Sequence, residues 1–487
     1  MKRFIINTLL GLLAVTSVLS CVKDLDIEQK SKITTSNMWK SESDATGAMY
    51  GMFHQFRAAL NTNIIYWGDF RSGTFADGLG AGIAVKMFNN NLDSTEGKGT
   101  NWGSLYTTIN DANLILKHCP GISYKSEDAK NLVLAQAYFV RAYCYYMIAR
   151  VWGDAPLLTT GFESDKDDLQ PVRTDVDEIY ALVASDIEKA LELMPETASD
   201  PTIGTRDAIL MLKADLYLWK YQVRNGTEED LATAEAAVDE VLAGTHGLLD
   251  SYASVFDINN KNNKEIILTL HFEKGEYEGG YADSWLIPSS RWVSADEHIE
   301  KDVKIMTSDD QRYNFSESMI ELLQSDYRDT RLPVCYGNWT DEVEGVTYTW
   351  INKFAGLWED NVRYFISDEP LYRYAEAVLF KAEIENEQRN TSSALTYLNM
   401  IAKRAYGVDG CYATTDYEKF KSLLCDEYVK EFAAEGKTWW VYNRLGFVFT
   451  KVETLRGRQN ETNILLWPIS NSCMNENPNI RQTVGYY

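Results

Sequence analysis

Two glutamates on one predicted helix have a spacing that acid and base chemistry could use. Glu376 and Glu383 lie seven residues apart in the tract RYAEAVLFKAE, so a helix presents both on one face. Two carboxyl groups with unequal pKa values can serve as the acid and the nucleophile of a glycosidase. Beside alanine and leucine, the same carboxylates would need cationic partners. We prefer this second interpretation, a scaffold role in which Arg404 and Arg444 are the candidate partners.

Two other segments, 66–77 and 277–292, combine flat aromatic rings with charged side chains and glycines. A sugar has an apolar C–H face that stacks on a ring and hydroxyl groups that bind polar side chains. The glycines favour loops, where such a surface would be exposed. The predicted ligand-binding residues are Trp67, Asp69, Arg71, Phe75, Asp77, Tyr281, Asp283, Trp285 and Trp292.

Core packing is the alternative interpretation of these tryptophans. For Trp67, core packing and ligand binding are equally favoured. For Trp102, core packing is favoured, because a tryptophan beside apolar helical positions is usually buried. Trp339, Trp350 and Trp358 are weaker candidates for ligand binding.

Signals for metal or cofactor chemistry are sparse. The five histidines have no H-x-x-x-H spacing, and the chain has no phosphate-binding loop and no nucleophile elbow. The acidic stretches 77–80 and 165–168 lack the full ligand series of a calcium site. We therefore predict a protein with no catalytic residue, no metal and no cofactor.

Cys21 follows a segment typical of a bacterial export signal. Two basic residues precede the apolar stretch 4–19, which is too short to span a bilayer and is followed by polar sequence. The residues before Cys21 form a loose lipoprotein cleavage box. We expect residues 1–20 to be a signal peptide, Cys21 to carry a lipid that anchors the protein to a membrane, and residues 21–40 to form a tether. An ordinary cleaved signal peptide is the alternative.

Composition narrows the class of partner. The chain has 47 Lys plus Arg against 71 Asp plus Glu, a formal charge of -24, so nucleic acid is disfavoured as a partner by repulsion. Aromatic residues make up 12% of the chain, more than a core is expected to absorb, which predicts some exposed rings.

The cysteines are scattered along the chain. Cys411 with Cys425 is the first disulfide to test, and small buried thiols are the alternative.

Apolar residues at spacings of three and four predict a mainly helical protein. Neighbouring helices of about 15 residues joined by short turns favour tetratricopeptide-like pairs. We expect one domain over 41–487, with a helical scaffold at about 41–243 and 371–487 and a loop-rich capping region at about 244–370 that holds a strand at 265–270. The predicted helices begin near Ser43 and then cover 102–118, 129–150, 176–193, 205–221, 228–242, 371–386, 392–406 and 416–440.

Five tracts in a fixed order resemble one protein family. They are LAQAYFVRAYCYYMIARVWGDAPLL (134–158), RYAEAVLFKAE (373–383), ALTYLNMIAKRAYG (394–407), EYVKEFAAEGKTWW (427–440) and LLWPISNSCMNENPNIRQTVGY (465–486). Together they are similar to the SusD/RagB family of Bacteroidetes surface lipoproteins. The resemblance implies four tetratricopeptide-like helix pairs and an irregular capping region that holds the ligand site.

The resemblance also implies a function. Such proteins lie at the cell surface over a SusC-like TonB-dependent outer-membrane transporter and capture oligosaccharides for import without breaking them. A RagB-like protein that binds peptides for import is the alternative. A surface glycosidase that uses Glu376 and Glu383 is the third and least favoured hypothesis.

Overall fold

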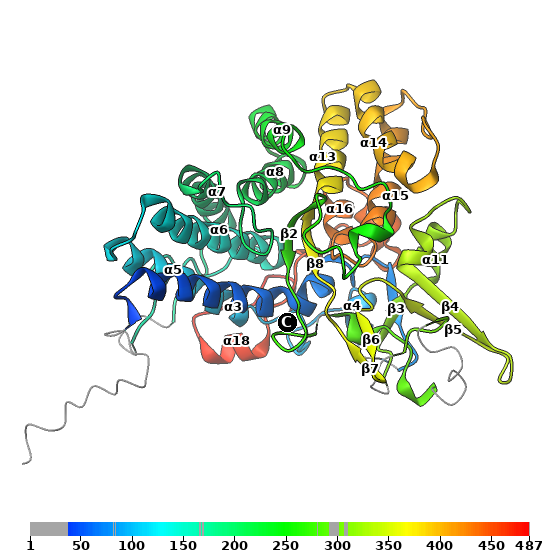
Figure 1. The fold of residues 1–487 in the computed structure, drawn as a ribbon, viewed down its shortest axis with the longest axis horizontal. Helices are drawn as coiled ribbons and strands as arrows, with labels where there is room; N and C mark the ends of the chain where they lie inside the picture. Colours follow the sequence, from blue (N-terminus) through cyan, green and yellow to red (C-terminus); the bar gives the residue numbers. More distant parts are fainter. Residues whose placement is uncertain are drawn as a thin grey trace, which may run out of the picture.

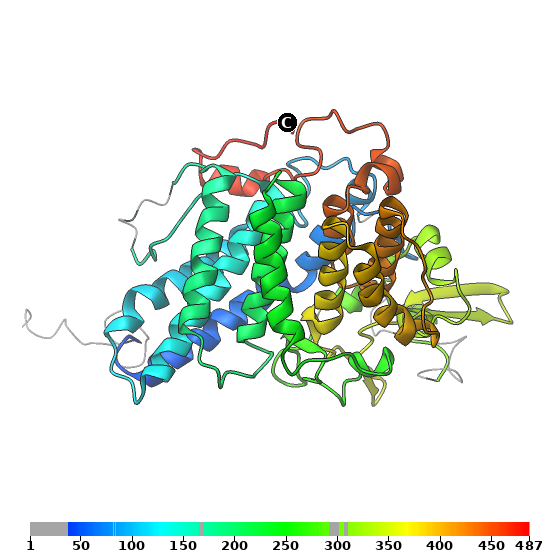
Figure 2. The ribbon, with the colours of Figure 1, turned by 90° about the horizontal axis from the view of Figure 1, so that it is seen from above.

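Helices packed side by side form the scaffold of the protein. The structure is a computed structural model, and it describes residues 38–80, 82, 84–164, 167, 170–279, 281–291, 301–305 and 310–486. Figure 1 shows the row of helices, and Figure 2 shows it from above. The first group is α3 (Glu42–Gly68), α5 (Gly103–His118), α6 (Glu127–Trp152), α7 (Val176–Leu193), α8 (Arg206–Val223) and α9 (Glu228–Leu242). The second is α13 (Tyr374–Glu387), α14 (Thr391–Tyr406), α15 (Tyr417–Glu431) and α16 (Thr438–Arg444). Neighbours in the chain pack as pairs, among them α6 with α7, α8 with α9, and α13 with α14.

Local sequence explains where several of these helices begin. Ser41 and Asp44 form a capping box at the start of α3, and Ser126 and Thr205 accept hydrogen bonds from the first turns of α6 and α8. The predicted bounds of α7 and α9 agree with the structure residue for residue. The mainly helical fold class predicted from the sequence is confirmed.

The helix α6 forms the centre of the scaffold. It is the one helix in the described part of the chain that is long and apolar enough to span a membrane, but 83% of that apolar window is buried in the protein. Its neighbours α3, α5, α7 and α8 cover it on several sides. This helix is therefore a core element, as its apolar residues on most faces predict.

Two predicted helices differ from the structure. The segment 371–386 starts as a strand, and 416–440 is interrupted between α15 and α16. At that interruption Ala434 and Gly436 have positive φ angles of 59° and 71°, and the backbone of Gly436 lies so close to Ile64 that a side chain would collide with it. A tertiary contact with α3 therefore ends a helix that local periodicity would continue.

Short strands pair in four two-stranded antiparallel ladders within the described residues. The predicted strand at 265–270 is found as β2 (Ile266–Leu270), which pairs with β8 (Glu369–Arg373). The others pair β1 (Phe75–Asp77) with β3 (Tyr313–Phe315), β4 (Tyr336–Asp341) with β5 (Val346–Ile351), and β6 (Leu357–Glu359) with β7 (Val362–Tyr364). Short helices α4 (Val85–Phe88), α11 (Glu317–Leu323), α12 (Leu332–Cys335), α17 (Val448–Lys451) and α18 (Asn471–Glu476) complete the chain.

The cysteines form no disulfide in the described part of the chain. The proposed pair is absent, because both Cys411 and Cys425 are free thiols. Burial raises the pKa of the Cys411 thiol, which makes it a poor nucleophile at neutral pH. The alternative, that most cysteines are small buried residues, describes Cys119, Cys144, Cys335, Cys425 and Cys473.

Candidate functional site

The two segments predicted to bind a ligand meet in the structure, although about 200 residues separate them in the chain. The ring of Phe75 on β1 lies 6.2 Å from that of Trp285, and Tyr281 lies 5.1 Å from Trp285 in an edge-to-face arrangement. These rings are interior: Phe75 and Tyr281 are 3% exposed and Trp285 is fully buried. The two segments therefore meet in the fold, but they meet through the packing of buried rings and not at an exposed surface.

Trp67 is likewise a core residue. Its ring is fully buried near the end of α3, its Nε1 donates to the carbonyl oxygen of Gly99 at 2.8 Å, and its edge packs on Trp152 at 5.5 Å. Trp102 also packs on Trp152, at 5.7 Å. For both residues the core-packing interpretation holds. The prediction that Trp67, Phe75, Tyr281 and Trp285 present stacking faces to a ligand is wrong for this structure, because protein atoms cover those faces.

Asp69 and Arg71 are also interior and hold distant segments together. The carboxylate of Asp69 accepts hydrogen bonds from the backbone N–H groups of Gly436 and Thr438 at 2.9 and 3.1 Å. The Arg71 guanidinium donates to the carbonyl oxygens of residues 464–466 and to Asn90, and it stacks on Trp439 at 4.5 Å. Both side chains are fully buried, so their predicted role in ligand binding is corrected to a structural one.

The substitution Asp69→Asn is expected to remove a pH-dependent part of the stability. Burial raises the pKa of Asp69 from its ordinary value of 3.8 to about 6. The folded state therefore takes up this proton before the unfolded state does, so the Asp69 contribution to stability rises as the pH falls from about 7 to about 4. Thermal melts at pH 5 and pH 8 should show the wild type gaining stability relative to the variant at pH 5. An equal difference at both pH values would contradict this assignment.

The exposed members of the predicted set, Asp77 and Asp283, lie at the surface of the β1–β3 ladder. Asp77 stands opposite Tyr313 across the ladder. The backbone N–H of Arg312 donates to the carbonyl oxygen of Ser284 at 2.8 Å, which brings the residue after Asp283 to the same edge. We name the surface formed by Asp77, Phe88, Lys98, Asp283 and Arg312, which lies over the buried rings of Tyr66 and Tyr313, the β-rim.

Hydrogen bonds and ring contacts hold the centre of the β-rim. The Lys98 ammonium donates to the hydroxyl of Tyr313 at 2.8 Å, and the hydroxyls of Tyr313 and Tyr66 are 3.5 Å apart. The half-buried ring of Phe88 packs edge-on against Tyr313 at 6.4 Å. A side chain from the early loop, Lys98, is thus fixed against a strand of the capping region.

Charges of both signs converge on the β-rim. The exposed Arg312 donates from Nε to Asp310 at 3.2 Å. Desolvation by neighbouring protein atoms raises the pKa of Asp283, although part of its side chain is exposed, and the charge of Arg312 opposes that effect. Burial, and then repulsion by Arg312, lower the pKa of Lys98. The surface therefore offers donors and acceptors side by side with an aromatic ring, which is a chemistry suited to hydroxyl-rich ligands.

Sequence reasoning missed Lys98, Arg312 and Phe88. Lys98 lies in a glycine- and lysine-containing stretch four residues before Trp102, outside both of the predicted segments, and Arg312 lies outside the segment 277–292. The pairing of β1 with β3 brings Arg312 close to Asp77. Trp292 and Cys21, which the sequence also singled out, lie outside the described residues.

A second aromatic surface flanks the β-rim on the β4–β5 hairpin. The rings of Trp339 and Tyr348 stack at 6.0 Å with an angle of 17° between them, and the Arg291 guanidinium lies 5.0 Å from the Tyr348 ring. The side chain of Asn314 on β3 donates to Thr349 on β5 at 2.7 Å, which joins this hairpin to the β1–β3 ladder. Trp339 is half-buried, so one of the weaker sequence candidates lies nearer to solvent than Trp67 does.

The two glutamates with catalytic spacing are buried and paired with cations. Glu383 accepts a hydrogen bond from Arg444 at 2.7 Å, as predicted, whereas Glu376 pairs with Lys437 at 2.9 Å. Burial raises the pKa of both carboxyl groups, and the paired cations oppose that effect. Arg404, the other predicted partner, instead binds Glu265 and Glu431. Within the described structure these carboxylates serve the scaffold, which is the preferred interpretation of their sequence.

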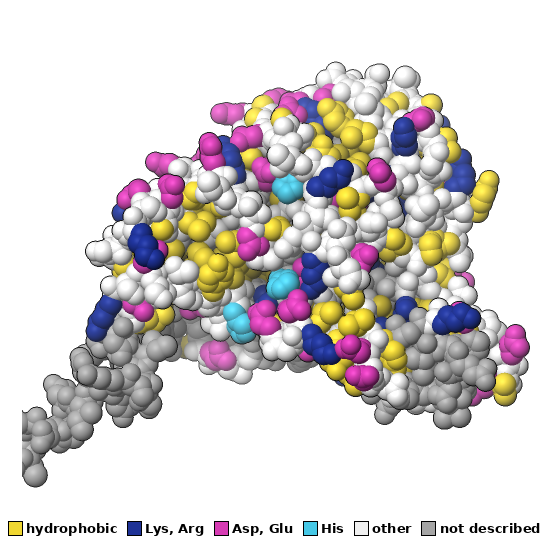
Figure 3. All heavy atoms as spheres, viewed as in Figure 1, with side chains coloured by type: hydrophobic (Ala, Val, Ile, Leu, Met, Phe, Trp, Pro, Cys, Tyr) yellow, Lys and Arg dark blue, Asp and Glu magenta, His cyan; other side chains and the backbone are white. Residues whose placement is uncertain are grey.

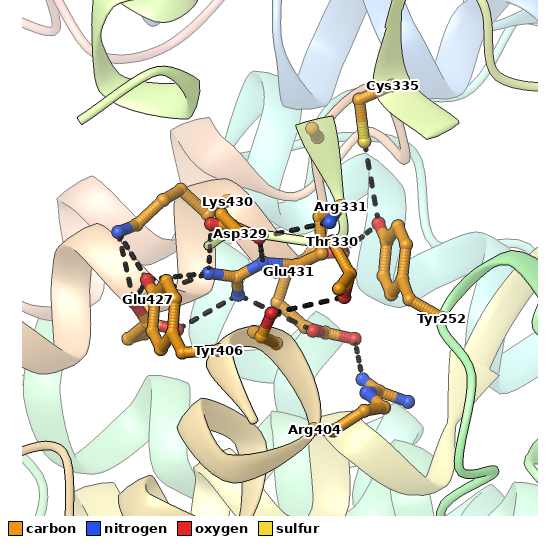
Figure 4. Close-up of polar contacts among 12 residues, drawn as sticks. Tyr252, Asp329, Thr330, Arg331, Cys335, Arg404, Tyr406, Glu427, Lys430 and Glu431 are labelled. Carbon is orange, nitrogen blue, oxygen red and sulfur yellow. Dashed lines mark hydrogen bonds and ion pairs between the residues drawn. The ribbon is translucent and has the colours of Figure 1, made fainter. Parts of the chain in front are cut away.

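A buried ionic network joins the capping region to the scaffold, and Figure 4 shows the part of it around Arg331, Glu427 and Glu431. Arg373 binds Glu265 at 2.9 Å, Glu431 at 3.0 Å and Glu435 at 2.8 Å. Burial alone would raise the pKa of Glu431, but nearby arginines outweigh it and hold that pKa below its ordinary value. Five cations and five carboxylates belong to the network, all in the interior: Arg331, Lys353, Arg373, Arg404, Lys430, Glu265, Asp329, Glu427, Glu431 and Glu435.

No group of three or more His, Cys, Asp or Glu side chains is placed to hold a metal ion among the residues that the structure describes.

Comparison with known proteins identifies the family. Residues 76–218 match a family model described as starch-binding and associating with the outer membrane, and residues 340–463 match the model of the SusD family. A SusD-like protein of Formosa agariphila is 24% identical over 519 residues, covering 100% of both chains. The chain belongs to the SusD/RagB family. Solved structures share its SusD-like fold.

A SusD superfamily protein from Bacteroides fragilis has a TM-score of 0.79 and 26% identity to this SusD-like chain, covering 92% of it and 100% of the other. NanU of B. fragilis has a TM-score of 0.80 at 24% identity, covering 95% and 100%. SusD-like proteins are glycan-binding proteins of polysaccharide utilisation, associated with the outer membrane and in general with SusC-like transporters, and this chain shares that general role.

Proposed function

We propose that this SusD-like protein binds oligosaccharides at the cell surface through its β-rim and passes them intact to a SusC-like TonB-dependent transporter in the outer membrane. A lipid on Cys21 would anchor it, and residues 21–40 would act as the tether. Binding and delivery need no bond to be broken, and no cofactor enters the proposal.

The observation that carries the proposal is the composition of the β-rim. Residues from an early loop and from the capping region, far apart in the chain, place Asp77, Asp283, Lys98 and Arg312 on one surface beside the Phe88 ring. Paired donors and acceptors can each bind a hydroxyl group, while a ring can contact the C–H face of a sugar. Phosphate or nucleic acid would instead favour an excess of positive charge, which the chain lacks.

The glycosidase hypothesis lacks support from the residues on which it depends. Two carboxyl groups must flank the same glycosidic bond for that chemistry. Glu376 is 5% exposed and Glu383 is 1% exposed, and each is paired with a cation. A substrate would have to displace buried ion pairs to reach them.

Affinity electrophoresis tests the ligand class. We expect at least one gel that contains starch, xylan, mannan, inulin or pectin to slow the wild-type protein, and the variant Arg312→Ala to move faster than wild type in that gel. The variant Arg328→Ala is the matched control, since Arg328 is an exposed arginine that pairs with Asp326 away from the β-rim. Isothermal titration with a peptide digest of casein runs in parallel. Binding of the peptides and of none of the glycans would replace this proposal with the RagB-like one.

A further inference from the structure

A cleft of about 190 Å³ lies on the side of α3 that faces β2 and the loop before α8. The residues that line it include Tyr50, His54 and Arg57 from α3, Thr202 from the loop, and His271 after β2. Figure 3 shows histidine beside acidic and basic side chains over this part of the molecule. None of these residues belongs to the β-rim.

Arg57 forms the polar wall of this cleft. Its guanidinium donates to the carbonyl oxygen of His271 at 2.6 Å and to Glu276 at 3.1 Å, and it lies 4.2 Å from the ring of Tyr277. The residue is 9% exposed, and its Nε is buried without a hydrogen-bond partner within the described structure. The contacts with His271 and Glu276 fix the guanidinium in place, so Arg57 gives the cleft a rigid polar wall.

The ion pairs around the cleft favour a neutral ligand over an anionic one. Arg57 is already neutralised by Glu276, and His271 and Lys261 are both paired with Asp368 at 3.1 Å. Among the described residues of the cleft, an anionic ligand would therefore find no lysine or arginine without an acidic partner. A neutral ligand fits this charge balance better than an anion does.

A ring stands at the mouth of the cleft. Tyr50 is 54% exposed, which is unusual for a ring of this size, and His54 beside it on α3 is also exposed. The floor is apolar and includes the buried side chains of Phe53, Leu268 and Leu270. An exposed ring, an apolar floor and the polar side chains of Thr202 and His54 are together the features that hold one sugar unit.

We propose that this cleft is a second carbohydrate-binding site, which takes one neutral sugar unit of a longer glycan. It rests on the proposed glycan-binding function and adds a contact remote from the β-rim. Tyr50 and Tyr66 are sixteen residues apart on α3, on either side of a kink at Asn61. The two sites would therefore act together on a polymer, but a disaccharide would reach only one of them.

Four proteins test this proposal: wild type, Tyr50→Ala, Arg312→Ala in the β-rim, and the control Tyr327→Ala. Tyr327 is 95% exposed and lies outside both surfaces, so it matches the loss of an exposed tyrosine ring. Affinity electrophoresis measures the apparent Kd for each of starch, xylan, mannan, inulin and pectin. Titration with maltose, xylobiose and mannobiose measures binding of short ligands.

We expect Tyr50→Ala to weaken binding of the retarding polysaccharide about tenfold, a loss typical of an important interface ring. Arg312→Ala should weaken that polysaccharide as well, while Tyr327→Ala should match wild type. If Tyr50→Ala binds every polysaccharide as tightly as wild type while Arg312→Ala does not, the second site is wrong and the proposed function stands. If none of these glycans binds the wild type, both proposals fail.

Discussion

Replacing Arg373 by methionine is expected to lower the free energy of unfolding by about 3–5 kcal/mol, the usual cost of leaving buried charges without their partner. Arg373 is fully buried at the end of β8 and is in contact with Glu265, Glu431 and Glu435. Methionine fills much of the space but leaves these carboxylates facing one another in the interior. Urea unfolding followed by tryptophan fluorescence measures the change.

The exposed ion pair of Arg328 with Asp326 provides the control. Because solvent screens an exposed pair, Arg328→Met should change the free energy of unfolding by no more than about 1 kcal/mol. Equal effects of Arg373→Met and Arg328→Met would mean that the buried network does not hold the capping region on the scaffold.

Trp67→Ala is expected to destabilise the fold by about 3–5 kcal/mol, as other large-to-small core substitutions do. The ring is fully buried, contacts Trp152 and donates to the Gly99 carbonyl oxygen at 2.8 Å. Its removal creates a cavity and leaves a buried acceptor without its donor. The midpoint of urea unfolding should fall accordingly, whereas a ring that serves only as a ligand platform would leave it unchanged.

Tyr327→Ala is the matched aromatic control, because its ring is almost wholly in solvent. We expect this change to alter the free energy of unfolding by at most about 0.5 kcal/mol. A Trp67→Ala protein as stable as the Tyr327→Ala protein would contradict the assignment of Trp67 to the core.

Helices were predictable because their signals are local. Caps and apolar spacing set the bounds of α7 and α9 without reference to the rest of the chain. The break between α15 and α16 was not predictable, because it depends on the contact of Gly436 with the backbone of Ile64 in α3. The periodicity of the residues in this segment does not depend on that contact. The strand β8, which precedes α13, was not predictable either, because it forms by pairing with the distant β2.

The candidate site was predictable only in part. Local composition singled out 66–77 and 277–292 one by one, but it did not predict the contact that joins Phe75 to Trp285. It could not tell which side chains face solvent, because exposure depends on partners elsewhere: Trp152 covers Trp67, and the carbonyl groups of residues 464–466 bind Arg71. Aromatic richness therefore indicated the region, while the charged residues Lys98 and Arg312 had no local signal.

The most direct test of the central claim is the affinity of a β-rim variant for the glycan that binds the wild type. The triple variant Lys98→Ala, Asp283→Ala and Arg312→Ala removes three of the four charged side chains of the β-rim and leaves Trp67, Trp285 and the ionic network in place. Isothermal titration should show Kd rising at least tenfold, with the melting temperature within a few degrees of wild type. An unchanged Kd in the folded variant would contradict the assignment of glycan binding to this surface.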